Sequence, residues 1–153
     1  WLDAHPEIGL LGADCDVISP EPGPHAPIDS PRDDVALRWQ TLFGHAFVHS
    51  LLMFRHTLFA KHGVAYSAEF PVATDYDWFT RALAATRAAT LPARLGAYRR
   101  HPTSFMRRHV AALPAALATL AHRHLARQLP AEADRASIAA IRAPHRMFAA
   151  AHP

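Results

Sequence analysis

The stretch Ile8-Gly9-Leu10-Leu11-Gly12-Ala13 decides the fold class, because it is a short apolar run bounded by turn-forming residues. Such a run is typical of a strand buried in a sheet. Residues 47–54 are mostly apolar between Gly44 and Arg55 and predict a second strand. A third extended segment is expected over residues 90–98, interrupted by Pro92.

Helical patterns lie between and after these segments. Ser30-Pro31-Arg32-Asp33 offers an N-cap serine and a proline at the first helical position, which predicts a helix to about Phe43. Residues 55–62 predict a short helix that Gly63 stops. Thr74-Asp75-Tyr76-Asp77 opens another helix, to about Ala85, with Thr74 and Asp77 as a capping pair.

The carboxy-terminal part of the chain has a different pattern. Beyond His109 it is rich in alanine, and its leucines recur at helical spacing: Leu113, Leu117, Leu120, Leu125 and Leu129. We therefore expect an α/β portion over residues 1–108, with a mixed sheet and flanking helices, followed by a helical extension over residues 109–153. The aromatic and sulfur-containing residues expected in the core are Met53, Phe54, Trp78 and Phe79.

Composition narrows the class of protein. With 153 residues, half of them apolar, the chain is long enough for one domain with a core. A single cysteine, Cys15, excludes an internal disulfide and a cysteine-based zinc cage, and it suits a reducing, cytoplasmic compartment. The apolar stretches are broken before they reach a membrane-spanning length. The net charge of +3 is too small and too dispersed to indicate nucleic-acid binding by itself.

Three segments resemble, in order and spacing, the second half of the family-2 glycosyltransferases of GT-A type. Residues 1–12 are similar to the helix-then-strand passage that follows the metal-binding aspartates of that family. His49-Ser50-Leu51-Leu52-Met53-Phe54-Arg55, with residues 62–66, is similar to the stretch beside its acceptor site. Ala73-Thr74-Asp75-Tyr76-Asp77, with Leu95-Gly96-Ala97-Tyr98-Arg99-Arg100-His101-Pro102 further on, is similar to its Glu-Asp motif and its later Tyr-Arg-x-His element.

The resemblance covers residues 1 to about 108 and implies the acceptor-side half of a GT-A fold. It implies transfer of a sugar from a nucleotide-diphospho-sugar to a hydroxyl of a glycan or lipid acceptor, in synthesis of cell-envelope glycans. The donor-binding strand and the aspartates that hold most of the Mn²⁺ or Mg²⁺ ion are not in this half, which predicts that the chain is inactive alone. A cytoplasmic location is implied, and the chemistry allows peripheral association with the inner face of the membrane.

The resemblance also assigns site residues. Asp75 takes the position of the catalytic base, and a first-turn carboxylate that stabilises the helix is the alternative. Thr74 stands where the family has glutamate, beside the acceptor, and His49 lies either on the acceptor side or in the core. Arg99 and Arg100 are expected to bind diphosphate, and His101 to ligate the metal. A surface basic cluster is the equal alternative for these three residues.

Asp14-Cys15-Asp16 has the Asp-x-Asp form in which GT-A enzymes present their metal site. Its neighbours, however, resemble the strand that follows the family's genuine motif, so a structural role is favoured. Two other functions stay open. One is a small basic helical module that binds nucleic acid or an anionic membrane through the helices after residue 105. The other is a histidine-rich metal-binding protein, although the 12 histidines show no paired ligand spacing.

Overall fold

The computed structural model describes residues 1–20, 23–101, 103, 109 and 111–128. Its strands are β1 (Ile8–Ile18), β2 (Met53–Phe54) and β3 (Arg87–Arg99). They form a three-stranded sheet in the order β2-β1-β3, in which β1 is antiparallel to β2 and parallel to β3. The α/β class and the mixed sheet are therefore confirmed.

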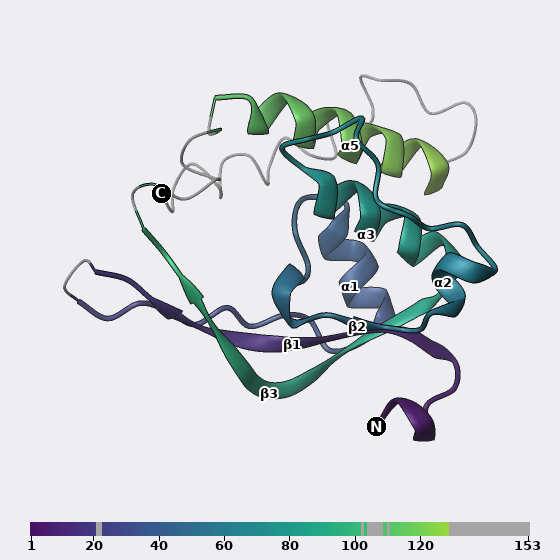
Figure 1. The fold of residues 1–153 in the computed structure, drawn as a ribbon, viewed down its shortest axis with the longest axis horizontal. Helices are drawn as coiled ribbons and strands as arrows, with labels where there is room; N and C mark the ends of the chain where they lie inside the picture. Colours follow the sequence, from purple (N-terminus) through teal and green to yellow (C-terminus); the bar gives the residue numbers. More distant parts are fainter. Residues whose placement is uncertain (21–22, 102, 104–108, 110, 129–153) are drawn as a thin grey trace.

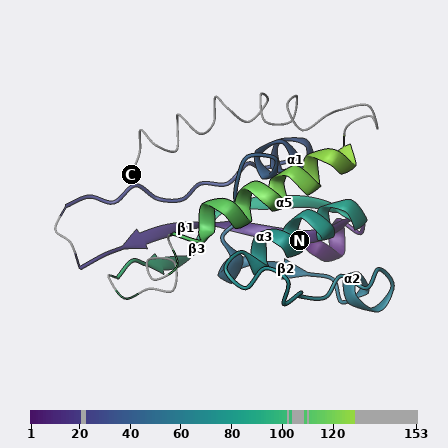
Figure 2. The same ribbon diagram turned by 90° about the horizontal axis from the view of Figure 1, so that it is seen from above.

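The helices lie on one face of this sheet (Figure 1). They are α1 (Asp34–Thr41), α2 (Thr57–Ala60), α3 (Thr74–Ala85) and α5 (Leu113–Gln128), with the 3-10 turn η2 (His49–Leu51). The 3-10 turn η1 (Leu2–Ala4) lies on the opposite face, where Leu2 packs against Ile8 and Leu11. Helix α3 lies between the sheet and α5, and the view from above shows α5 running along the top of this helical layer (Figure 2). The order of layers is thus sheet, α1 with α3, and α5.

The main core fills the space between the sheet and α3. Leu10 of β1 and Trp78 and Phe79 of α3 have no exposed surface, and Trp78 Nε1 donates a hydrogen bond of 3.1 Å to the Val64 carbonyl. The core prediction is confirmed for these two aromatics. It is wrong for Met53, which is 62% exposed, because successive residues of β2 point to opposite faces and only Phe54 packs on the core.

Strand β1 is longer than the apolar run that predicted it. It continues from Ala13 to Ile18 because β3 pairs with it along almost its whole length, ending at Ile18 opposite Arg99. The ladder is interrupted at Pro92, since Ala13 pairs with Leu91 and Asp14 with Arg94. A bulge at this point accommodates the proline, which has no amide hydrogen to donate.

Helix α1 begins later than the sequence predicts. Its N-cap is Asp33, whose Oδ1 accepts a hydrogen bond of 2.9 Å from the Ala36 amide. Ser30 is buried, and its amide donates to Asp14 at 3.1 Å. The serine therefore joins the loop to β1 and does not cap the helix.

The predicted strand over residues 47–54 is wrong except at its end. Phe47 and Val48 are buried, the chain then turns through η2, and only Met53 and Phe54 pair with β1. The short helix predicted over residues 55–62 is present but shorter, Thr57–Ala60. Gly63 stops α2 with φ of +61°, and its amide donates to the Phe59 carbonyl at 3.1 Å.

The predicted capping pair of α3 is also wrong. Ala73 occupies the N-cap position, and Thr74 Oγ1 donates to the Phe70 carbonyl at 2.8 Å. Asp77 accepts hydrogen bonds of 3.0 and 2.6 Å from Nε and Nη2 of Arg81. The Asp77 carboxylate therefore faces the next turn of the helix and not its amino-terminal amides.

Helix α5 confirms the helical character of the chain over residues 113–128. Its buried Leu120 and Ala121 pack against Tyr76 of α3, with Leu113 and Leu117 partly buried beside them. Leu129 and the rest of the predicted extension lie outside the described residues. Within the part of the chain that the structure describes, no helix is long and apolar enough to cross a membrane.

Candidate functional site

A cleft of about 480 Å³ opens where the amino-terminal end of α3 meets the segment before and within η2. Its walls also include the loop before α1 and the end of β3. The residues that line it are Ile28, Asp29, Ser30, Gln40, His45, Ala46, Phe47, Val48, His49, Ser50, Asp75 and Tyr98. The second and third of the segments that carry the family resemblance thus meet in one cavity.

Asp75 lies in the first turn of α3 with its side chain one-third exposed. Oδ1 accepts a hydrogen bond of 2.8 Å from the Tyr76 amide, which fixes the orientation of the carboxylate. Oδ2 lies 3.8 Å from Nδ1 of His45, a separation longer than a hydrogen bond. One carboxylate oxygen is thus bound to the helix, while the other faces a titratable ring within the cleft.

His45 is the site residue that sequence reasoning missed. Its ring lies 5.3 Å from the Tyr76 ring and 6.2 Å from the Phe79 ring, measured between centroids. Burial lowers the pKa of His45 below its usual value, and the neighbouring Asp75 charge offsets part of this effect. The ring is therefore neutral at pH 7. Its one sequence signal is a polar residue in the apolar passage after Gly44.

His49 lies on the same side of the cleft but is exposed, so its expected alternative place in the core is wrong. Its Nε2 is hydrogen-bonded to the Tyr66 hydroxyl at 2.8 Å, and its ring is 5.9 Å from the Phe79 ring. Burial, followed by the Asp75 charge, raises the pKa of Tyr66, so the phenol stays protonated at pH 7. His49 is thus held in place by a neutral partner.

The remaining predicted site residues do not line the cleft. Thr74 is hydrogen-bonded to the Phe70 carbonyl in the segment before α3, as described above. Arg99 and Arg100 are exposed, and the Arg100 amide donates to the Ile18 carbonyl at 2.8 Å. Tyr98 lines the cleft instead, because neighbouring residues of a strand point to opposite faces. His101 Nδ1 is 3.2 Å from Thr103 Oγ1.

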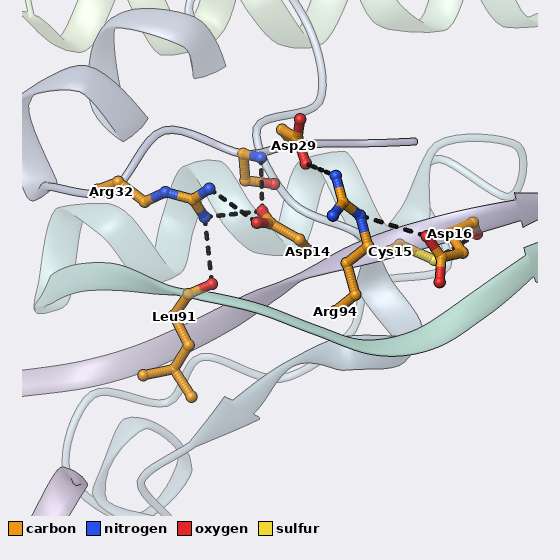
Figure 3. A network of polar contacts seen from close by, with 8 residues as sticks. Asp14, Cys15, Asp16, Asp29, Arg32, Leu91 and Arg94 are labelled. Carbon is orange, nitrogen blue, oxygen red and sulfur yellow. Dashed lines mark hydrogen bonds and ion pairs between the residues drawn. The ribbon is translucent and has the colours of Figure 1, made fainter. Parts of the chain in front are cut away.

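Asp14 and Asp16 have cationic partners (Figure 3). The two oxygens of Asp14 accept hydrogen bonds of 2.7 Å each from Nη1 and Nη2 of Arg32. These bonds hold the pKa of the Asp14 carboxyl below its usual value. Asp16 lies 3.3 Å from Arg94, which also binds Asp29 at 3.1 Å. The motif therefore fastens β1 to the loop before α1 and to β3.

Metal ligation finds little support in this arrangement. Among the described residues, no three His, Cys, Asp or Glu side chains lie close enough together to hold a metal ion. The Asp14 oxygens are occupied by a guanidinium group, and His101 lies apart from the cleft-lining residues. The described residues thus do not fit the role of principal ligands for Mn²⁺ or Mg²⁺.

Comparison of the chain with models of protein families, with curated proteins and with solved structures gave no match.

Proposed function

We propose that this chain is the acceptor-side portion of a family-2 glycosyltransferase of GT-A type, with Asp75 as the catalytic base. The observation that carries the proposal is the meeting of Asp75 and His49 in one cleft. They come from two separate segments of the sequence that resemble the family. The proposal includes the fold: the sheet and the helices around the cleft would be the acceptor-side part of a GT-A fold.

The proposed reaction uses the free oxygen of Asp75. Oδ2 accepts the proton of an acceptor hydroxyl as the hydroxyl oxygen forms a bond to the anomeric carbon of the sugar. The bond from that carbon to the diphosphate breaks, and its electron pair leaves with the nucleoside diphosphate. Because Oδ1 is held by the Tyr76 amide, Oδ2 is oriented before the acceptor arrives.

The walls of the cleft suit a glycan or lipid-linked acceptor. Phe47, Val48 and Tyr98 offer apolar and aromatic surface, while Asp75, His45 and His49 offer polar atoms. Such a mixture of apolar walls and a few polar groups is typical of small-molecule sites. Under this proposal, as the family resemblance implies, the donor nucleotide and most of the ligands of the divalent cation belong to a donor-binding half joined to this chain.

The proposal is tested on an enzyme in which this chain is joined to a donor-binding half. Asp75→Asn keeps the size of the side chain but removes the base, so the transfer rate falls about 10²–10⁴-fold while nucleotide-sugar binding stays intact. Asp33→Asn is the matched control, because asparagine caps α1 as well as aspartate does. Turnover by Asp75→Asn equal to that of the unmodified enzyme removes Asp75 from the mechanism.

The alternative of a basic helical binding module gains no support from the described part of α5. Arg123 lies 2.7 Å from Glu69 and stacks 4.9 Å over the centroid of the Phe70 ring. This guanidinium group already has an anionic and an aromatic partner within the chain. A role for the residues after Gln128 lies outside the described part of the chain.

A further inference from the structure

The two carboxylate oxygens of Asp75 have different environments, and this difference indicates a second residue that acts on the carboxylate. Oδ1 is held at 2.8 Å by the Tyr76 amide, whereas Oδ2 faces Nδ1 of His45 at 3.8 Å. A movement of less than 1 Å brings the second pair within hydrogen-bond distance. Catalytic hydrogen bonds are often long without substrate and shorten when substrate binds.

His45 is held so that this approach is feasible. The rings of Tyr76 and Phe79 lie against it, and its carbonyl accepts a hydrogen bond of 3.1 Å from Gln40 Nε2 of α1. With the ring 31% exposed, one part of it contacts the core and another part opens to the cleft. The ring is therefore positioned by packing, and its distance to Oδ2 is set by the segment before η2.

Among the described residues, the electrostatic influences on the His45 ring come from Asp75 and His49. Asp75 approaches from α3, and His49 from η2 acts in the opposite direction on the charge of His45. Asp29 and Tyr98 line the same cleft from the loop before α1 and from β3, and the Asp29 carboxylate is bound to Arg94 at 3.1 Å. The charge state of His45 is therefore linked chiefly to its burial and to Asp75.

We infer that His45 is the positioning partner of Asp75: the neutral imidazole donates its Nδ1 hydrogen to Oδ2. Protonation of the ring turns this contact into an ion pair, and Oδ2 then accepts the proton of the acceptor hydroxyl less readily. The effect of His45 on catalysis rests on the proposed function. The hydrogen bond between His45 and Asp75 does not, and it can be tested without an enzyme assay. The neutral ring orients Oδ2 toward the acceptor. The charged ring competes with the acceptor proton for the same oxygen, so the site is active above the His45 titration and inactive below it.

The pairing is tested first by nitrogen NMR of the histidine side chains in the 153-residue chain. The expected neutral form of His45 carries its hydrogen on Nδ1. Asp75→Asn removes the charge that favours protonation, so the His45 titration moves to lower pH. A hydrogen on Nε2 in the neutral form, or a His45 titration that Asp75→Asn does not move, overturns the pairing.

The catalytic consequence is tested on the enzyme joined to its donor half, with two substitutions of His45. His45→Asn places an amide donor near the position of Nδ1 and does not titrate, so it keeps turnover at pH 8 within a few-fold and moves the acid limb of the pH profile to lower pH. His45→Phe keeps the ring packing without the donor, so kcat falls about tenfold with little change in the acceptor KM. His62→Gln is the control, and its profile stays unchanged.

The outcomes separate this inference from the proposed function. Transfer with an unaltered acid limb in His45→Asn and unaltered kcat in His45→Phe overturns the role of His45, while Asp75 stands as the base. Absence of transfer in every form, with the NMR pairing present, overturns the proposed function and leaves the His45–Asp75 pairing in place. A loss of packing in His45→Phe is recognised from its unfolding curve.

Discussion

Asp14 and Asp75 are both acids considered from the sequence for a role in a reaction site, yet the structure places them in opposite situations. Asp14 is 4% exposed, and both of its oxygens are hydrogen-bonded to Arg32 at 2.7 Å. Asp75 is one-third exposed and keeps one oxygen at 3.8 Å from a neutral histidine, in a cleft. A carboxylate with every oxygen bound stabilises a fold, whereas one that is oriented and still open is available for chemistry.

The comparison is tested most strongly by the stability of two matched variants. Asp14→Asn gives up the charge-assisted bonds to Arg32, and it lowers the free energy of unfolding by about 2 kcal/mol. Asp75→Asn changes it by less than about 0.5 kcal/mol, because the amide oxygen still accepts from the Tyr76 amide. Urea unfolding at pH 7 measures both, and equal losses for the two variants would contradict the distinction.

His124 of α5 sharpens the comparison, because among the described residues it is a buried polar group without a hydrogen-bond partner. It is 2% exposed, and neither ring nitrogen has a hydrogen-bond partner among the described residues. Burial lowers the pKa of His124 to about 4. The unfolded chain, with a histidine pKa near 6.5, then binds more protons between these two values, so stability falls as the pH drops from 6.5 toward 4.

The size of the stability loss at low pH follows from the difference between the His124 pKa values of the folded and unfolded chain. Between pH 7 and pH 5 the unmodified chain loses about 2 kcal/mol more stability than His124→Leu does. Thermal unfolding of both forms at the two pH values measures the difference. An identical acid loss in His124→Leu shows that the ring is not buried in its neutral form.

The smallest expected effect on stability distinguishes Asp33, which caps α1, from Thr74, which was predicted to cap α3 but does not. Asp33→Ala removes the hydrogen bond to the Ala36 amide and costs about 1 kcal/mol, whereas Asp33→Asn costs almost nothing. Thr74→Ala costs less than Asp33→Ala, because Thr74 donates to a carbonyl and does not cap the helix amides. Denaturant titration ranks the three variants, and a larger loss for Thr74→Ala would restore the capping pair.

The sequence predicted those helices and strands that are determined by residues close together in the chain. The apolar run at Ile8–Ala13 marks the buried part of β1, and the Gly63 stop of α2 follows from a positive φ that glycine adopts readily. The helix over residues 74–85 was predicted with its correct carboxy-terminal end, and its start was misplaced by one residue because Ala73 and not Thr74 is the N-cap. In each case the residues that decide the structure lie within a few positions of one another.

The errors come from contacts between residues far apart in the chain. Strand β1 continues through Asp14 because of its pairing with β3, some 80 residues later, and Ser30 is drawn away from α1 by the same Asp14. The role of His45 depends on the fold that brings it beside Asp75, 30 positions further on. No periodicity or spacing records such contacts, so the sequence predicted Asp75 and His49 but not their neighbours.

The measurement that tests the central claim most directly combines two readings on one variant, Asp75→Asn, in the enzyme joined to its donor half. The account predicts that the transfer rate falls about 10²–10⁴-fold while the free energy of unfolding stays within about 0.5 kcal/mol of the unmodified protein. Full transfer activity, or a loss of activity that follows a loss of folded protein, would contradict the claim that Asp75 is the open, functional carboxylate.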